Sequence, residues 1–256
     1  MLKNTNKLLL SSVTALSLFA TTANAGVLLD FEVGAGSWNA NPSGDLNYGT
    51  EVDIEKDFGL SDSNNTYLFA DFNHFVPIVP NVRIEQQSLK TDASASRSFT
   101  WNSQTIGINN KTDLDLTQQD LILYWGVPGL NLLTAGIVDL NFGLDIKKFD
   151  GYITANNETA DLDFVLPMGY LAATIDPPFM PATLSASYKT INYDGSSIND
   201  MMAKVSIDLP IPIPLLDIKF DLGYKEQSLK ISESVSDNIS ADIKFDGMFF
   251  GVSAKF

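Results

Sequence analysis

Residues 136–147 read GIVDLNFGLDIK, and this stretch decides the fold class. From position 138 the even positions are apolar, while the odd positions carry Asp139, Asn141, Gly143, Asp145 and Lys147. Successive side chains of a strand point to opposite faces, so the alternation predicts a strand with one apolar and one polar face. It runs well beyond an ordinary strand of about 5–6 residues. It matches the ~9–11 residues of a tilted strand that crosses a bilayer.

The same alternation recurs along the chain, at 162–170, 201–209 and 216–225 among others. In 162–170 the apolar residues occupy the even positions, which predicts that Leu162 to Tyr170 face outward and that Asp161 and Asp163 face inward. Ten candidate strands lie near 26–36, 65–75, 81–92, 113–127, 133–149, 159–172, 181–193, 200–209, 216–231 and 239–256. We therefore expect an all-β fold: a closed antiparallel transmembrane β-barrel of ten strands, within a range of eight to twelve.

The connections fall into two classes. Those at 76–80, 127–129, 176–181 and 210–214 are short and contain proline, which cannot donate to a strand ladder and so belongs in turns. Those at 37–64, 93–112, 150–158, 194–199 and 232–238 are polar and often longer. Short turns at one end and longer loops at the other are typical of outer-membrane barrels, and an even strand count puts both ends of the barrel at the short-turn side.

The composition is acidic yet sparsely charged. Asp and Glu number 31 against 16 Lys and Arg, for a net charge of -15, but charged residues make up only 18% of the chain, below the roughly 25% of average proteins. The acidity argues against nucleic-acid binding. Without cysteine there are no disulfides or thiolate sites, and the single histidine excludes mechanisms that need two.

Residues 1–25 have the layout of a cleaved secretory signal peptide. Lys3 and Lys7 precede a short apolar stretch, and Ala23-Asn24-Ala25 forms a small-x-small cleavage box before Gly26. The apolar stretch is shorter than the ~20 residues of a membrane-spanning helix. Residues 26–256 are then expected to form a single barrel domain.

The chain ends with an alternating strand that stops on phenylalanine. Its expected outward face includes Phe250, Val252, Ala254 and Phe256. Ile243 and Phe245 are out of phase with these residues, which predicts a β-bulge near Gly247. The strand resembles the terminal strand of bacterial outer-membrane β-barrel proteins, and the chain looks most like small outer-membrane barrels of marine Gram-negative bacteria.

The resemblance implies several properties beyond the fold. It implies Sec export to the outer membrane, and a C-terminal assembly signal read by the barrel-assembly machinery after passage with periplasmic chaperones. The expected surroundings are outer-membrane lipid and lipopolysaccharide, and a monomer is favoured. Neither a cofactor nor a nucleic-acid partner is expected.

The inward face is predicted to carry charges of both signs. The candidate lumen-lining residues are Asp30, Glu32, Arg83, Glu85, Asp139, Asp145, Lys147, Lys189, Lys204, Asp208, Asp217, Lys219, Asp221 and Lys225, with Asp242, Lys244 and Asp246 on the last strand. Eight strands are just filled by side chains, whereas open porins use 16–18. The first interpretation is a structural or interaction barrel with a lumen cross-braced by ion pairs. The alternative is a small cation-preferring, porin-like channel.

Other classes have less support. A soluble β-sandwich or lipocalin-like barrel would also alternate, but would keep its charges outside. Outer-membrane proteases and lipases need a histidine beside an acid or a serine, and the single His74 is expected at the short-turn end, so no enzymatic activity is expected. The acids Asp53, Glu55, Asp57 and Asp62, and a second run of Asp113, Asp115 and Asp120, could bind Ca²⁺. Their spacing departs from known calcium loops, and a solvated acidic loop is expected instead.

Overall fold

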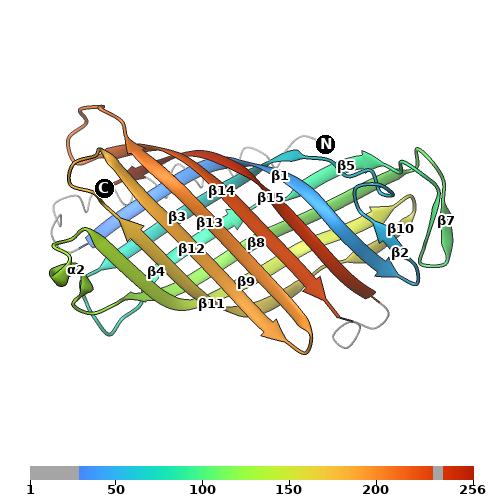
Figure 1. Cartoon of the computed structure of the whole chain (residues 1–256), viewed down its shortest axis with the longest axis horizontal. Coiled ribbons are helices and arrows are strands. Elements are labelled where there is room, and N and C mark those ends of the chain that lie inside the picture. The colour runs from blue at the N-terminus through green and yellow to red at the C-terminus, as the bar shows by residue number, and fades with distance from the viewer. Residues whose placement is uncertain (1–28, 233–238) are drawn as a thin grey trace, which may run out of the picture.

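The computed structural model describes residues 29–232 and 239–256, so the predicted signal peptide lies outside the described residues. Ten long strands close into one ring, in which each strand pairs antiparallel with its neighbours and the last pairs with the first (Figure 1). In ring order they are β1 (Leu29–Tyr48), β3 (Ser63–His74), β4 (Asn81–Gln87), β8 (Lys111–Gly126), β9 (Val138–Ala155), β11 (Phe164–Ile175), β12 (Ala182–Tyr193), β13 (Ser196–Asp208), β14 (Asp217–Ile231) and β15 (Ile239–Lys255). The predicted closed ten-stranded antiparallel barrel is confirmed.

Shorter elements extend the ring at its outer-loop end. They are β2 (Glu51–Asp53), which pairs with β1, β5 (Lys90–Ser94), which continues along β8, β10 (Glu158–Asp161), which continues along β9, and the hairpin of β6 (Phe99–Trp101) and β7 (Gln104–Ile106). The short-turn end carries α2 (Leu130–Leu133). In the described ranges, no helix has the length and apolarity needed to cross a membrane. The first strand runs to Tyr48, well beyond the expected end at 36.

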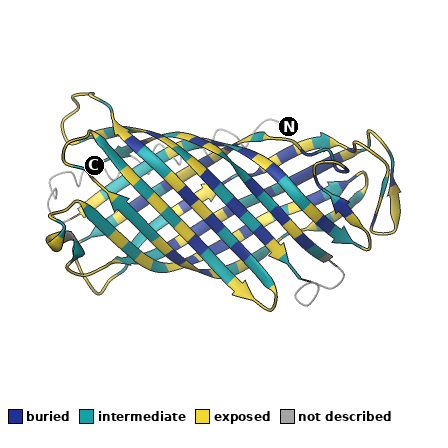
Figure 2. Cartoon of the chain, viewed as in Figure 1, coloured by how far each residue is buried: buried dark blue, intermediate teal, exposed yellow. Residues whose placement is uncertain are grey.

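Nearest the short turns, the barrel has an apolar exterior and a polar interior, and Figure 2 shows the exposed and buried residues alternating along the strands. Apolar outward residues form a continuous band around the ring, which we call the belt. The belt residues include Leu68, Phe72, Ile84, Leu121, Leu140, Phe142, Leu144, Ile146, Leu171, Ile175, Leu184, Tyr188, Met201, Ile207, Phe220, Leu222, Met248, Phe250 and Val252. The alternation expected for 136–147, 201–209 and 216–225 is therefore confirmed.

In the outer half of the barrel the polarity of the two faces is reversed. Trp38, Phe149, Ile153, Ile243 and Phe245 are buried in one apolar core inside the ring. The ring of Phe149 packs against Phe164 with centroids 4.5 Å apart. These strands continue past the belt, where the exterior is polar and the interior is filled with apolar side chains.

The expected orientation of 162–170 is wrong, because the apolar residues at its even positions lie inside the ring. Phe164, Leu166 and Met168 pack in the inner core, and Tyr170 packs against Tyr124 nearer the short turns. Met168 and Tyr170 are buried inside the barrel, whereas Val165 and Leu171 are exposed on the outside. Asp161 and Asp163 are likewise exposed rather than directed into the lumen. The physical reason is that an apolar face of a strand can be matched either to the belt or to the inner core, and the alternation is the same in both cases.

The bulge predicted near Gly247 is also wrong. The register between β15 and β14 is continuous from Asp217↔Lys255 to Ile231↔Ala241. On the other side, the pairing with β1 skips Gly247 and Met248 but resumes with the same offset, so no extra residue is inserted. Ile243 and Phe245 differ in phase from Phe250 because they face the inner core. The polar residues that alternate with them, Asp242, Lys244 and Asp246, therefore face outward and not into the lumen.

These outward residues pair along the outer wall. Lys244 bonds Glu226 of β14 at 3.0 Å, and this hydrogen bond raises the pKa of Lys244. Tyr224 donates its hydroxyl to Asp246. Charged side chains can take these outward positions because this part of the wall lies beyond the belt.

Two connections cap the outer end of the inner core. Phe58, from the β2–β3 connection, packs edge-on against Trp101 of β6 with centroids 5.1 Å apart. Thr112 of β8 donates its hydroxyl to the Phe58 carbonyl oxygen at 2.7 Å. Ile54, Phe58 and Trp101 are essentially inaccessible to solvent. The cap therefore closes the outer-loop end of the barrel with tightly packed, buried side chains.

The reversed outer half gives a direct prediction for stability. Ile243→Ala should lower the free energy of unfolding by about 2–5 kcal/mol, because it opens a cavity in the inner core. Ile108→Ala, in the exposed β7–β8 connection, should change it by less than about 0.5 kcal/mol. Urea unfolding of the barrel in lipid vesicles measures both. Equal effects of the two substitutions would contradict an inward-facing Ile243.

Candidate functional site

The structure places twelve of the fourteen predicted lumen residues inside the barrel, at two heights, and the other two at exposed strand ends. Glu85, Asp145, Lys147, Lys189 and Lys225 are buried at mid-height. Asp30, Glu32, Arg83, Asp139, Lys204 and Lys219 line a cavity nearer the short turns, and Asp221 is buried behind it, paired with Lys204 at 3.1 Å. Asp208 and Asp217 lie at the strand ends, where Asp208 pairs with Lys219 at 3.5 Å.

Lys189 is the centre of the mid-height ion network. Its ammonium group, carried by β12, reaches across the lumen to Glu85 of β4 at 2.5 Å and also bonds Asp120 of β8. Glu85 in turn accepts hydrogen bonds from Arg83 at 2.6 Å and from the Tyr67 hydroxyl at 2.7 Å. These side chains come from four strands, so the contacts tie opposite walls of the barrel together.

A second cation, Lys147 of β9, extends the network toward the remaining strands. It contacts Asp120 at 2.8 Å and Asp200 of β13 at 3.2 Å. Asp200 also pairs with Lys225 of β14. Buried charges are costly unless they are paired and hydrogen-bonded, and this chain of contacts supplies each cation with a carboxylate.

A pair of glutamines closes the lumen directly above these ions. Gln118 of β8 donates its amide to Gln227 of β14 at 2.8 Å, and Gln227 donates back at 2.7 Å. The two strands stand five apart in a ring of ten, so they lie on opposite walls. Both side chains are buried. Side chains that touch from opposite walls leave no continuous water-filled passage along that line.

Aromatic rings support the cations from the side of the inner core. The Arg83 guanidinium lies 4.1 Å from the centroid of Phe69, and the Lys225 ammonium lies 5.5 Å from Trp38. Such cation–π contacts contribute most when the cation is desolvated. The ion network therefore adjoins the apolar core without a water layer between them.

Asp145 is the least satisfied member of the network. It is fully buried on β9, and neither carboxylate oxygen has a hydrogen-bond partner among the described residues. The nearest cation is Lys189, 4.0 Å away. Asp145 therefore carries the electrostatic cost of a buried carboxylate with little local compensation.

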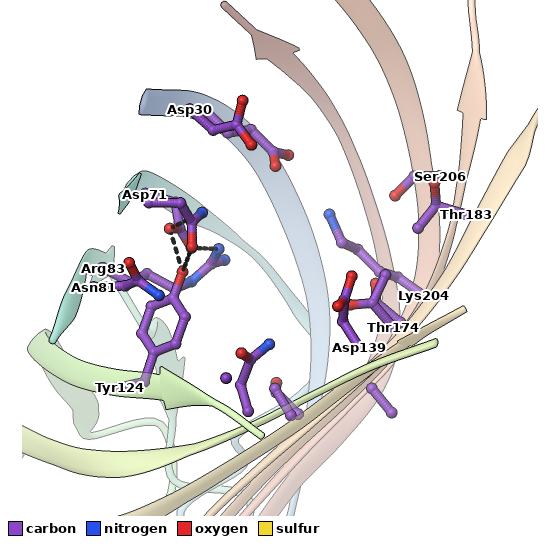
Figure 3. Close-up of a pocket in the computed structure, with 18 of the residues that line it drawn as sticks. Asp30, Asp71, Asn81, Arg83, Tyr124, Asp139, Thr174, Thr183, Lys204 and Ser206 are labelled. Atoms are coloured by element: carbon purple, nitrogen blue, oxygen red, sulfur yellow. Dashed lines mark hydrogen bonds and ion pairs between the residues drawn. The ribbon is translucent and has the colours of Figure 1, made fainter. Parts of the chain in front are cut away.

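Below the network, a cavity of about 460 Å³ opens toward the short turns, and we call it the vestibule. Figure 3 shows Asp71, Arg83 and Tyr124 joined on one wall, with Asp139, Thr174 and Lys204 on the facing wall. Tyr124 donates its hydroxyl to Asp71 at 2.6 Å, and Arg83 pairs with Asp71 at 3.0 Å. The vestibule is thus a polar pocket with mixed charge, closed at its inner end by the ion network.

Several members of the network were missed from the sequence. They are Asp71, Asp120, Asp200, Tyr67, Tyr124, Gln118 and Gln227. Asp71 shares its strand face with Tyr67 and Phe69, so that face is not uniformly polar and no clear alternation marks it. Asp120 lies in the run QQDLILYW (118–125), where no clear alternation separates the faces. A strict parity count along β3 would have found Asp71.

His74 lies at the short-turn end, where its contacts are with the turn backbone. Its Nε2 donates to the Pro80 carbonyl oxygen at 3.0 Å, and the Val76 amide donates to its Nδ1 at 3.2 Å. Both ring nitrogens are therefore occupied by the β3–β4 connection. The His74 side chain therefore stabilises that turn through its two backbone hydrogen bonds.

In the acidic outer loop, the carboxylates of Asp53 and Asp57 also bond neighbouring backbone and side-chain groups. Asp53 accepts amide hydrogen bonds from Glu55 at 3.0 Å and Lys56 at 2.8 Å. Asp57 accepts the Asp53 amide at 2.8 Å and pairs with Arg97. Within residues 29–232 and 239–256, no three histidine, aspartate or glutamate side chains cluster closely enough to hold a metal ion.

Comparison with known proteins returns structural likenesses only. No protein-family model matches the chain, and no curated protein matches it by sequence. The outer-membrane protease OmpT of Escherichia coli has 10% identity and a TM-score of 0.45, covering 90% of this chain and 96% of its own. Ail of Yersinia pestis has 9% identity and a TM-score of 0.37, with 90% and 100% covered. Neisserial surface protein A has 10% identity and a TM-score of 0.35, with 88% and 97% covered.

The ion network predicts a large effect from one substitution. Lys189→Met should lower the free energy of unfolding by about 3–5 kcal/mol, because Glu85 and Asp120 lose their shared buried cation. Lys148→Met removes an exposed partner of Asp150, 3.4 Å away, and should cost less than about 1 kcal/mol. Urea midpoints in vesicles compare the two variants. A tolerated Lys189→Met would show that the network does not brace the barrel.

Proposed function

We propose that the protein is an integral outer-membrane β-barrel with a closed lumen and a structural or interaction role. The observation that carries this proposal is the pair of glutamines joined across the barrel from opposite strands. The ion network lies below that pair, and the apolar core and its cap lie above it. Three successive barriers of different chemistry support a barrel that holds its shape rather than one that conducts.

The belt supports placement in a membrane. A ring of outward leucine, isoleucine, phenylalanine and valine side chains leaves a large apolar surface exposed, which in a water-soluble monomer would be unfavourable. Closure of the sheet gives every strand of the ring a hydrogen-bonded neighbour on both sides, as a bilayer requires. The outer membrane of a Gram-negative bacterium is the proposed location, reached by Sec export, with lipopolysaccharide and phospholipid around the belt and a monomer as the proposed state.

The capped outer end supports an interaction role. The β2–β3 and β5–β8 connections stand above the belt on a packed base that includes Phe58 and Trp101. A rigid base holds such loops in a fixed arrangement, which favours contact with external partners over gating. We propose no catalytic role, because the two ring nitrogens of His74 are bound to turn backbone.

The proposed location is tested by expression in a Gram-negative host. The chain should appear in the outer-membrane fraction and should migrate differently on cold SDS gels before and after heating. Deletion of Phe256 alone should lower that folded yield, because we propose that the terminal Phe belongs to the signal read by the barrel-assembly machinery. The matched control is Phe31→Ala. The ring centroids of Phe31 and Phe256 lie 6.0 Å apart, so this variant removes the ring contact but keeps the terminal Phe.

Two results would count against these assignments. Soluble periplasmic protein without a heat-dependent shift would contradict membrane placement. Normal outer-membrane yield after loss of Phe256 would contradict only the assembly signal.

The closed lumen is tested by planar-bilayer recording. The purified barrel should give no steady single-channel steps in salt solution, while a 16-stranded porin inserted under the same conditions conducts. Salt-dependent steps that disappear in Asp139→Asn or Asp221→Asn would instead establish the cation-preferring channel.

A further inference from the structure

The four short connections form an unusual surface, which we call the rim. They span residues 75–80, 127–137, 176–181 and 209–216, and Asp176 is their only charged residue. Large apolar side chains project from all four, with exposed fractions of 62% to 88% for Phe75, Ile78, Leu132, Leu133, Phe179 and Leu215. A contiguous exposed apolar surface marks a site of contact with a protein or a membrane. We therefore expect the apolar side chains at this end of the barrel to be shielded from water.

Asp176 is exposed and gives the rim one charge, on the side of the vestibule. It lines the vestibule and accepts the Thr183 hydroxyl at 2.5 Å. The outer-loop end contrasts with the rim, since a single connection there carries Glu55, Lys56, Asp57 and Asp62. The two ends of the barrel therefore suit different surroundings.

The height of the belt shows what covers the rim. On β9 the outward apolar run extends from Val138 to Ile146, and Lys148 follows on the same face. At about 3.3 Å per residue and a tilt of about 40°, that run spans roughly 20 Å along the barrel axis. The apolar band of an outer-membrane barrel is about 25 Å tall. The apolar run on the strands is therefore about 5 Å shorter than such a band. The rim adjoins this run at the short-turn end and can supply the remaining height.

The backbone of the rim is also suited to a medium without water. Nine of the 11 prolines of the chain lie in these four connections, at 77, 80, 128, 177, 178, 181, 210, 212 and 214. Each removes an N–H group that would otherwise need a partner. In hydrocarbon an unsatisfied backbone group costs several kcal/mol, so a proline-rich turn has fewer such groups to satisfy.

Local bonds satisfy many of the remaining polar groups. The amides of Leu133 and Thr134 bond carbonyl oxygens of their own turn at 3.0 and 2.9 Å. Trp125 donates its indole N–H to the Ile78 carbonyl oxygen at 3.2 Å. His74 binds the Pro80 carbonyl oxygen and the Val76 amide, as described above. Side chains of the barrel thus supply partners that water would otherwise provide.

We infer that the rim is immersed in the periplasmic leaflet, where phospholipid acyl chains cover its exposed side chains. This inference rests on the proposed membrane placement and deepens it. The belt and the rim then form one continuous apolar band of the height that the membrane needs. The vestibule opens at the level of the inner headgroups, and the outer half of the barrel stands clear of the membrane.

The chain offers a clean test because it contains no cysteine. Single variants Ile78→Cys, Phe179→Cys and Leu215→Cys place a nitroxide label on three different rim connections. Leu144→Cys labels the belt, and Asn157→Cys labels an exposed outer turn. Each variant is checked for heat-dependent migration and reconstituted into phospholipid vesicles without other proteins. Collision of the label with oxygen and with a water-soluble nickel chelate is then measured.

Rim labels should resemble the Leu144 label: oxygen should broaden their spectra strongly, and the nickel chelate should have little effect on them. The label at Asn157 should respond strongly to the nickel chelate. Rim labels that resemble Asn157, while Leu144 remains shielded from nickel, would overturn the inference and leave the membrane barrel intact. That outcome would point to a periplasmic protein or a second copy as the cover. Nickel access at Leu144 as well would contradict the proposed membrane placement itself.

Discussion

Closure of the sheet between β15 and β1 is the constraint on which the rest of the structure depends. Phe256 and Phe31 exchange backbone hydrogen bonds at the short-turn end, and the pairing of β1 with β15 extends to Tyr48 at the other, with a gap at Asn39 and Ala40. Once the ring is closed, every side chain must point either into a narrow interior or out to the surroundings. The chemistry of each position is then set by two coordinates: the face and the height along the axis.

Those two coordinates explain why the polarity of the faces reverses along the barrel. Beside the belt, apolar groups face outward and the interior must hold the polar ones, which satisfy one another as ion pairs. In the proposed membrane placement the exterior beyond the belt meets water, which suits Lys244 facing outward while Phe245 packs inside. The interior network around Lys189 lies at the boundary between these two regimes. Its pairing limits the cost of burying charge, and it ties together strands that are not neighbours in the ring.

The same axis accounts for the composition. An acidic chain with few charges is what results when charge is excluded from the belt and the rim and is concentrated in the outer loops and the lumen. Prolines follow the opposite distribution, with Pro42 and Pro167 the exceptions outside the short connections. Charged residues and prolines are therefore segregated along the barrel axis for two different reasons. Charges need solvation, and backbone donors need partners where water is absent.

The sequence by itself determined the ten strands, their antiparallel closure and the proline-rich connections at one end, because period-two alternation and proline placement are local properties. It did not show that the strands continue into the expected outer loops, where only residues 194–195 separate β12 from β13. Of the fourteen candidates named for the lumen, twelve lie inside the barrel, because a charge between belt residues can face only the interior. Asp208 and Asp217 are exposed at the strand ends, and the charges beyond the belt, such as Asp163 and Lys244, face outward. Only the tertiary structure decided which way the apolar faces of β11 and the start of β15 point. An alternating strand looks the same whether its apolar face meets an outer belt or an inner core, and the sequence pattern does not record height along the axis. The partners of Lys189 and the contact between Gln118 and Gln227 likewise depend on which strands oppose each other across the ring, a relation that arises only when the barrel closes.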